Sequence, residues 1–202
     1  MTAPEGPGGP EEPEAPAPAE PSDGGAAPGP RGMLGDPWVR FALTFGALAV
    51  VTEVVYYGLA LESSLMQAYL RTLARISGWI LGLLGQPVTV DEAVISGELF
   101  AVEIAQGCDA YRICALLSAA ILAFPARWST KVWGLVLGLA WLNSLNFVRI
   151  VGLYFVGGLH RDHFQQAHEV YFPVFLVCMT VLAWILWVRR ATRDFDAEPA
   201  AA

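Results

Sequence analysis

The chain has 202 residues, 55% of them hydrophobic, and a mean hydropathy of +0.47. This composition excludes an ordinary soluble domain and directs attention to long apolar segments. The formal net charge of −7 does not indicate a basic partner, because the acids gather at the two ends of the chain, with seven in residues 1–36 and three in residues 193–202.

The N-terminal end is rich in proline, glycine and glutamate. Residues 1–36 hold nine of the fourteen prolines and no aromatic residue, so they cannot bury enough apolar surface to offset the entropy lost on ordering. They also lack the basic start and apolar centre of a signal peptide. We expect a disordered tail at 1–36, a membrane domain at 37–192 and a disordered acidic tail at 193–202.

Four apolar segments are long enough to cross a bilayer as helices, which takes about 20 residues. They are residues 38–61, 108–126, 132–158 and 170–188. The sequence therefore predicts an all-α polytopic membrane protein with about four transmembrane helices.

The segment between the first two predicted spans has mixed character. In residues 63–85 the apolar side chains recur at helical spacing while polar ones line another face, which predicts an amphipathic helix lying in the membrane interface. The apolar set is Met66, Tyr69, Leu73, Ile76, Ile80 and Leu83, and the polar set is Gln67, Arg71 and Arg75. Because the C-terminal half is strongly apolar, a fifth span remains the alternative. Residues 87–107 then alternate apolar and polar residues around Gly97, which predicts a short extracytoplasmic β-hairpin or lid.

Basic residues set the expected orientation. Arg127 and Lys131 flank the turn after the second span, and three arginines follow the fourth span, namely Arg189, Arg190 and Arg193. Because cytoplasmic ends carry the excess of lysine and arginine, we expect both termini in the cytoplasm. The second span then starts at Cys108 on the outer side, the third emerges near Tyr154, and the fourth starts near His168.

Reactive residues from three predicted helices thus meet in one outer layer. Arg149 lies roughly 8 Å below Tyr154 at 1.5 Å per residue. A helix N-terminus, a cation or a histidine lowers the pKa of a thiol, so Cys108 is a candidate nucleophile. His168 could act as general base and then acid, and Arg149, which is costly inside a span, could stabilise an oxyanion.

Two asparagines precede the arginine on nearly the same helical face. Asn143 and Asn146 lie six and three residues before Arg149. They could hold the guanidinium or line a substrate pocket.

Three short motifs carry a family resemblance. "GCDAYR" opens the second span, "NFVRIV" lies late in the third, and "AHEVYF" opens the fourth. In this order they resemble the signatures of the exosortase/archaeosortase family of membrane transpeptidases, most closely exosortase H, over residues 38–190. The resemblance implies a catalytic Cys108, Arg149 and His168. Arg112 matches a basic position of the family and is assigned to a substrate carboxylate or to a structural contact.

The resemblance also implies the substrate class. The enzyme would cleave exported proteins that carry a C-terminal sorting signal, made of a short motif, a transmembrane span and a basic end. Cleavage would pass through a thioester at Cys108 on the extracytoplasmic side of the inner or plasma membrane, with transfer to a cell-envelope acceptor. Besides such proteins and membrane lipid we expect no nucleic-acid partner, no cofactor and no metal. One position departs from the family pattern, since Ala110 stands where a glycine is common two residues after the cysteine.

Less specific interpretations remain open. Cys114 and Cys178 lie deeper in their spans and are interpreted as inert packing residues. Arg149 could pair with Glu53, a carboxylate inside the first predicted span, and His168 could be an ordinary interfacial histidine. The sequence leaves the recognised motif and the acceptor open.

Two alternatives to a cysteine enzyme belong to other functional classes. One is a metal-dependent hydrolase, because a ten-residue stretch offers enough ligands for zinc, namely His160, His163 and His168 with Asp162 and Glu169. The other is a non-enzymatic membrane scaffold or lipid-binding protein. This alternative would not explain why the reactive residues converge.

Overall fold

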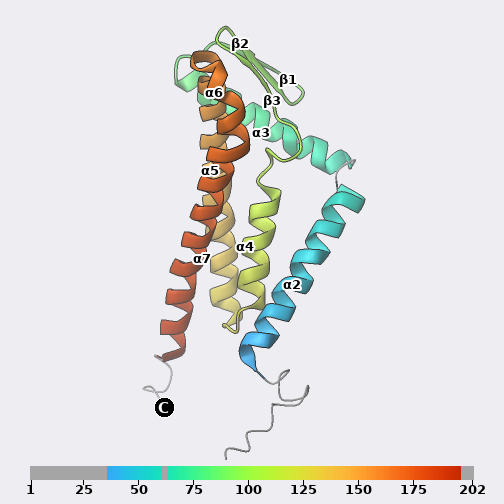
Figure 1. The fold of residues 1–202 in the computed structure, drawn as a ribbon, viewed down its shortest axis with the longest axis vertical. Helices are drawn as coiled ribbons and strands as arrows, with labels where there is room; N and C mark the ends of the chain where they lie inside the picture. Colours follow the sequence, from blue (N-terminus) through green and yellow to red (C-terminus); the bar gives the residue numbers. More distant parts are fainter. Residues whose placement is uncertain (1–35, 61–62, 197–202) are drawn as a thin grey trace, which may run out of the picture.

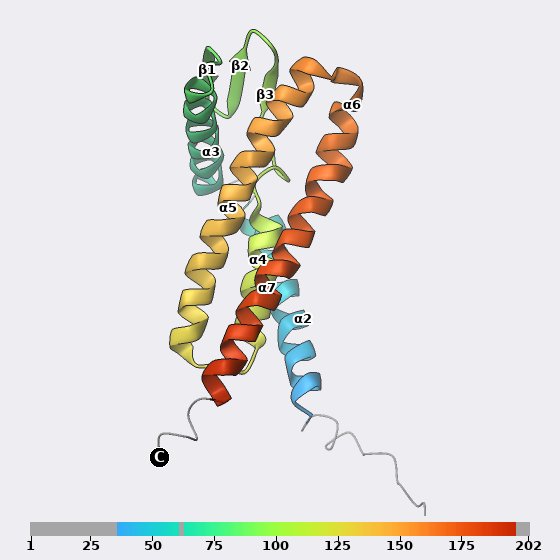
Figure 2. The same cartoon turned by 90° about the vertical axis from the view of Figure 1, so that its left-hand side faces the viewer.

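The computed structural model describes residues 36–60 and 63–196 (Figure 1). Apart from Asp36, the tail predicted at 1–36 lies outside the described residues, as do residues 197–202 of the predicted C-terminal tail. Long helices lie side by side, and a small sheet and a transverse helix cover one end of the bundle (Figures 1 and 2). The predicted class, a mostly helical membrane protein with a small β-structure, is confirmed.

Within the part of the chain that the structure describes, three helices are long and apolar enough to cross a membrane. They are the stretches Pro37–Gly58, Trp128–Leu159 and Arg161–Arg193. The first contains helix α2 (Pro37–Val55) and part of the π-helical turn η1 (Tyr56–Ala60), and the second is helix α5 (Trp128–Leu159). The third contains α6 (Arg161–Gln166), the π-helical turn η2 (Ala167–Tyr171) and most of α7 (Phe172–Asp196), which runs four residues into the tail predicted from 193.

The second predicted span is shorter than expected. Helix α4 (Tyr111–Ala123) has 13 residues, about 20 Å at 1.5 Å per residue, against a hydrocarbon core of about 30 Å. Pro125 ends it, because the residue before a proline is driven out of the helical conformation and Phe124 is extended at φ −71°, ψ 136°. Helix α4 packs against α2, α5 and α7. Within the described residues, three of the four predicted spans are thus long apolar helices and the second is a short helix packed against them, so the prediction of about four transmembrane helices is not confirmed.

Helix α3 (Ser64–Leu83) lies across the end of the bundle (Figure 1). Its first turn is capped by Ser63, whose hydroxyl accepts a bond from the N–H of Met66 at 3.1 Å. Among the described residues it is not one of the helices long and apolar enough to span a membrane, so the fifth span receives no support.

The buried face of α3 differs from the predicted one. It consists of Met66, Leu70, Leu73, Ala74, Ser77, Gly78 and Leu81, whereas Ile76 and Leu83 of the predicted face are exposed. The small residues at its centre permit close packing of the sheet. A Cβ atom at Gly78 would overlap the side chain of Val90.

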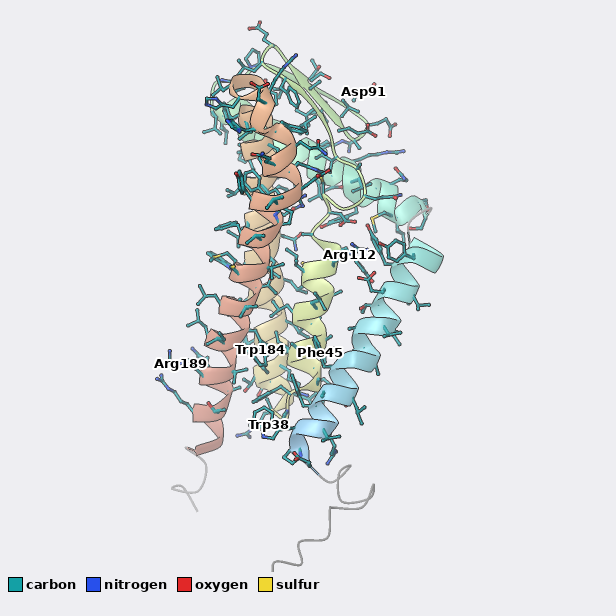
Figure 3. The ribbon with its side chains drawn as sticks, in the orientation of Figure 1. Trp38, Phe45, Asp91, Arg112, Trp184 and Arg189 are labelled. Carbon is teal, nitrogen blue, oxygen red and sulfur yellow. The ribbon has the colours of Figure 1, made fainter. Side chains whose placement is uncertain are left out.

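The sheet has one strand more than the predicted hairpin. Strands β1 (Val88–Asp91), β2 (Val94–Gly97) and β3 (Ala101–Glu103) form an antiparallel meander in the order β1-β2-β3. The sheet contacts α3 and α5 and lies at the opposite end of the bundle from Trp38 and Arg189 (Figure 3).

One hydrophobic core cluster lies where α3, the sheet and α5 meet. Ile95 of β2 and Tyr154 of α5 are fully buried in it, and Cys108 belongs to the same cluster. A Cβ atom at Gly97 would overlap the hydroxyl of Tyr154. This packing fixes the outer half of α5 against the sheet, and the chain leaving β3 returns from there to the start of α4.

Candidate active site

Three segments bring the predicted reactive residues together. Cys108 lies in the loop between β3 and α4, Arg149 on α5 and His168 on η2. The Cys108 Sγ and His168 Nε2 atoms are 3.1 Å apart. The Arg149 guanidinium donates from Nη1 to the main-chain oxygen of Gly107 at 3.1 Å, and is 5% exposed. The arrangement has the geometry of a nucleophile, a proton acceptor and a fixed cation.

Asn146 also binds the loop that contains Cys108. Its Nδ2 donates to the main-chain oxygen of Cys108 at 3.0 Å, and the side chain is fully buried. One turn apart on α5, Asn146 and Arg149 therefore bind consecutive carbonyl groups of the cysteine loop. Two buried polar atoms here have no partner within the described residues, namely Asn146 Oδ1 and Arg149 Nε. Such atoms are costly unless a ligand or water satisfies them.

The loop needs unusual backbone conformations to turn into α4. Gly107 has φ +92° and Ala110 has φ 54°, both in the left-handed region. Ala110 stands where the family resemblance leads one to expect glycine, and an alanine in this region is strained by roughly 1 kcal/mol. The structure thus gives a backbone reason for glycine at this position.

A π-helical turn positions His168. The N–H of Phe172 bonds to the oxygen of Ala167, five residues earlier, and Pro173 has no N–H with which to continue a regular ladder. The imidazole lies parallel to the ring of Phe164, with ring centroids 6.0 Å apart. The proline-linked turn and the aromatic contact together hold the ring against Cys108.

Asp109 is a site residue that the sequence interpretation missed. It is 2% exposed, and its Oδ2 accepts a bond of 2.6 Å from the hydroxyl of Tyr56. Its Oδ1 accepts from the N–H of Tyr111, the first residue of α4, at 3.2 Å. The carboxylate therefore connects the cysteine loop to both η1 and α4. Its position directly after Cys108 was a visible signal, whereas Tyr56 lies 53 residues away and gave none.

A tyrosine of α3 also reaches this loop. The hydroxyl of Tyr69 lies 2.9 Å from the main-chain oxygen of Asp109 and 3.1 Å from Asn143 Oδ1, and donates its single proton to one of them at a time. Burial raises the pKa of Tyr69 to about 12, so the hydroxyl stays protonated at neutral pH. Asn143 also donates to the main-chain oxygen of Leu139 at 2.8 Å. Both ends of the Asn143 amide are thus engaged within the protein, whereas Asn146 Oδ1 has no partner within the described residues.

The Arg112 side chain extends from α4 towards α2 (Figure 3). Its Nε lies 3.4 Å from Glu53 Oε1, and its guanidinium lies 5.2 Å from the ring centroid of Tyr57. Both charged side chains are about half exposed. The alternative in which Glu53 neutralises Arg149 is therefore wrong, because Glu53 pairs with Arg112.

The electrostatics of Cys108 differ from the sequence-based expectation. Burial raises the pKa of the Cys108 thiol, the Arg149 guanidinium opposes this shift, and the charge of Asp109 adds to it. The expected lowering of the pKa is thus wrong in direction, because burial outweighs the nearby cation. A neutral thiol 3.1 Å from an imidazole nitrogen needs that nitrogen to take its proton at the moment of attack.

The alternative metal site finds no ligand set. Within the part of the chain that the structure describes, no group of three or more histidine, cysteine or acidic side chains is placed to hold a metal ion. The His160 and His163 rings are 6.4 Å apart, while His168 faces Cys108.

Cys114 and Cys178 are free thiols, and the Cys114 sulfur lies 3.8 Å from Asn143 Nδ2.

Comparison with known proteins gives one match. Residues 33–185 match a family model described as transmembrane exosortase (Exosortase_EpsH). No curated protein and no solved structure matches the chain. The matched region contains all three long apolar helices up to residue 185, together with Cys108, Arg149 and His168.

Proposed function

Because the chain belongs to the transmembrane exosortase family, we propose that it is a membrane cysteine endopeptidase or transpeptidase that cleaves C-terminal sorting signals of exported proteins. The resemblance is closest to the exosortase H branch. The observation that carries the proposal is the 3.1 Å contact between Cys108 Sγ and His168 Nε2, made beside a buried arginine.

The first half of the reaction forms a thioester. His168 Nε2 takes the thiol proton while the sulfur of Cys108 attacks the scissile carbonyl carbon, and the carbonyl oxygen becomes an oxyanion. The buried Nε of Arg149, which has no partner within the described residues, is a fixed donor that could bind such an oxyanion. Collapse of the intermediate breaks the C–N bond, and the imidazolium returns its proton to the leaving amine.

The second half releases the product. An acceptor amine or a water molecule gives its proton to His168 and attacks the thioester, and Cys108 leaves as a thiol once it regains a proton. The proposed acceptor is a component of the cell envelope, with water as the competing acceptor. No metal or cofactor enters either half.

The orientation of the site follows from the same proposal. A sorting signal whose basic end stops in the cytoplasm presents its short motif just outside the membrane, above its own span. Cys108 lies in the loop that follows β3, and the sheet lies at the end of the bundle opposite Arg189 (Figure 3). The positive-inside rule places Arg189 in the cytoplasm, and hence the site at the outer face.

Replacing the nucleophile tests the proposal. Cys108→Ala should abolish processing of exported proteins that carry a C-terminal motif, span and basic end, and their uncleaved precursors should accumulate in the membrane. Cys114→Ala and Cys178→Ala are matched controls, because neither thiol contacts His168, and both should process normally. Normal processing by Cys108→Ala would remove the nucleophile assignment and favour a non-enzymatic role.

A further inference from the structure

The outer edge of strand β3 is open. In the order β1-β2-β3, no strand of the described chain pairs with the far side of β3. The N–H of Gly97 bonds to Phe100 O at 3.0 Å and the N–H of Ile104 to Ala93 O at 2.9 Å. Bonded and non-bonded pairs alternate along an antiparallel ladder, so Ala101 and Glu103 turn their main-chain N–H and C=O groups towards the open edge.

Strand β3 is aligned with the candidate active site. The chain runs from Glu103 to Cys108 in five residues. At the other end of the strand, the ring of Phe100 packs on Phe164 of α6 with centroids 5.0 Å apart, and Phe164 in turn lies against His168. The segment that contains β3 therefore touches the helix that carries His168 at both of its ends.

An apolar groove lies deeper in the bundle than the site, towards the end of the bundle opposite the sheet (Figure 3). It has a volume of about 330 Å³ and lies between α2, α4 and α7, starting at Ile113 in the first half of α4. Its lining includes Phe41, Phe45, Leu116, Val177 and Trp184. A chain that passes Cys108 from the outer side can thus continue as an apolar helix beside α4.

We propose that the recognition segment of the substrate binds as a fourth strand on β3, parallel to it, with main-chain hydrogen bonds to Ala101 and Glu103. The proposal rests on the proposed function. The parallel direction follows because both β3 and the sorting signal run from the outer side towards the membrane. Strand addition is a common way to bind extended peptides, in which main-chain bonds supply affinity and alternate side chains supply specificity.

If the substrate binds as a strand, every second residue of its recognition motif faces the same side of the sheet. One set of substrate side chains would lie on the buried side of the sheet with Val102, and the other set on the outer side with the exposed Glu103. Only the first set meets the protein closely. The recognised motif should therefore specify every second residue and tolerate variation between them.

Proline substitutions test the open edge. Ala101→Pro and Glu103→Pro each remove one outward donor without removing a bond to β2, a position at which edge strands tolerate proline. Loss of one such bond should lower processing of sorting-signal precursors about tenfold. Val88→Pro is the matched control, because Val88 starts β1 and turns its N–H to the opposite edge of the sheet. It should process within about twofold of the unmodified protein.

Two further measurements distinguish failure of the fourth-strand proposal from failure of the proposed function. The rate of iodoacetamide reaction with Cys108 reports whether the site itself is intact, and it should change less than about twofold in the proline variants. If these variants keep that rate and process precursors normally, the fourth strand is refuted while the proposed function stands. If Cys108→Ala also processes normally, the proposed function itself fails.

Cross-linking tests the proposed strand if the proline substitutions also slow the reaction of Cys108 with iodoacetamide. The photoreactive residue p-benzoylphenylalanine is placed at position 101 or 103 of the Cys108→Ala protein, and at the exposed position 89 of β1 as a control. Cross-links to uncleaved precursors from 101 and 103 but not from 89 support the proposal. Equal cross-linking from all three positions, or none from 101 and 103, overturns it.

Discussion

The bond between Tyr56 and Asp109 should stabilise the cysteine loop measurably. The Tyr56 hydroxyl donates to Asp109 Oδ2 at 2.6 Å, and the acidic side chain is 2% exposed, so water cannot readily replace a lost bond. A hydrogen bond to a charged group contributes about 1.5–3 kcal/mol. We expect Tyr56→Phe to lower the free energy of unfolding by about 2 kcal/mol.

A double-mutant cycle measures this coupling. Unfolding is followed by tryptophan fluorescence, with seven tryptophans in the chain, as sodium dodecyl sulfate is added to protein in mild micelles. The cycle compares Tyr56→Phe, Asp109→Ala and the double variant. Tyr57→Phe is the matched control, because the neighbouring Tyr57 side chain is 57% exposed and contacts Arg112 through its ring.

The expected interaction energy is about 1.5–3 kcal/mol between Tyr56 and Asp109. The Tyr57→Phe change should alter stability by less than about 0.5 kcal/mol. If the effects of Tyr56→Phe and Asp109→Ala add to within about 0.5 kcal/mol, the two groups are not coupled. The view that this bond holds η1 against the cysteine loop would then be refuted.

The remaining predictions concern the loop, the thiol, the arginine and the topology. Ala110→Gly should raise the free energy of unfolding by about 1 kcal/mol, since Ala110 has φ 54°; a lower stability in the same assay contradicts this. Because the pKa of Cys108 is raised, the rate of its reaction with iodoacetamide should increase with pH through a midpoint above that of an ordinary thiol. Arg149→Ala should raise this midpoint and Asp109→Asn should lower it. Shifts in the opposite directions would refute these charge effects on the thiol. Arg149→Ala should slow processing at least about 10²-fold, and Arg149→Lys should rescue it poorly; near-normal activity with lysine would indicate simple charge compensation. With a membrane-impermeant thiol reagent, Cys108 should react in intact cells or spheroplasts and a cysteine at Ser129 only after lysis; the opposite result would invert the topology.

The reactive residues could be found from the sequence because they are rare in their surroundings. An arginine within an apolar run is costly enough to need a reason, and Arg149 does bind the loop before Cys108. Tyr56 could not be found in this way, since a tyrosine in an apolar segment is ordinary and its partner lies 53 residues away. The raised pKa of Cys108 was also beyond the sequence, because it depends on burial by other segments.

Element lengths and packing faces were predicted less well, for identifiable reasons. A count of apolar residues made 108–126 a full span, but Pro125 and the left-handed Ala110 limit α4 to 13 residues. Large apolar residues were used to choose the face of α3. The sheet instead packs where Ser77 and Gly78 leave room for it.

The two π-helical turns have a consequence for how this chain tolerates insertions and deletions. Each turn contains one residue more than a regular helix would need, and each carries a side chain of the site, Tyr56 in η1 and His168 in η2. Deleting one residue within 169–171 would restore a regular helix and rotate everything before it by about 100° relative to α7. His168 would then leave Cys108 although every side chain of the site remained in the chain. Alignments of related chains should therefore keep the spacing from His168 to the membrane-embedded part of α7 even where the intervening residues vary.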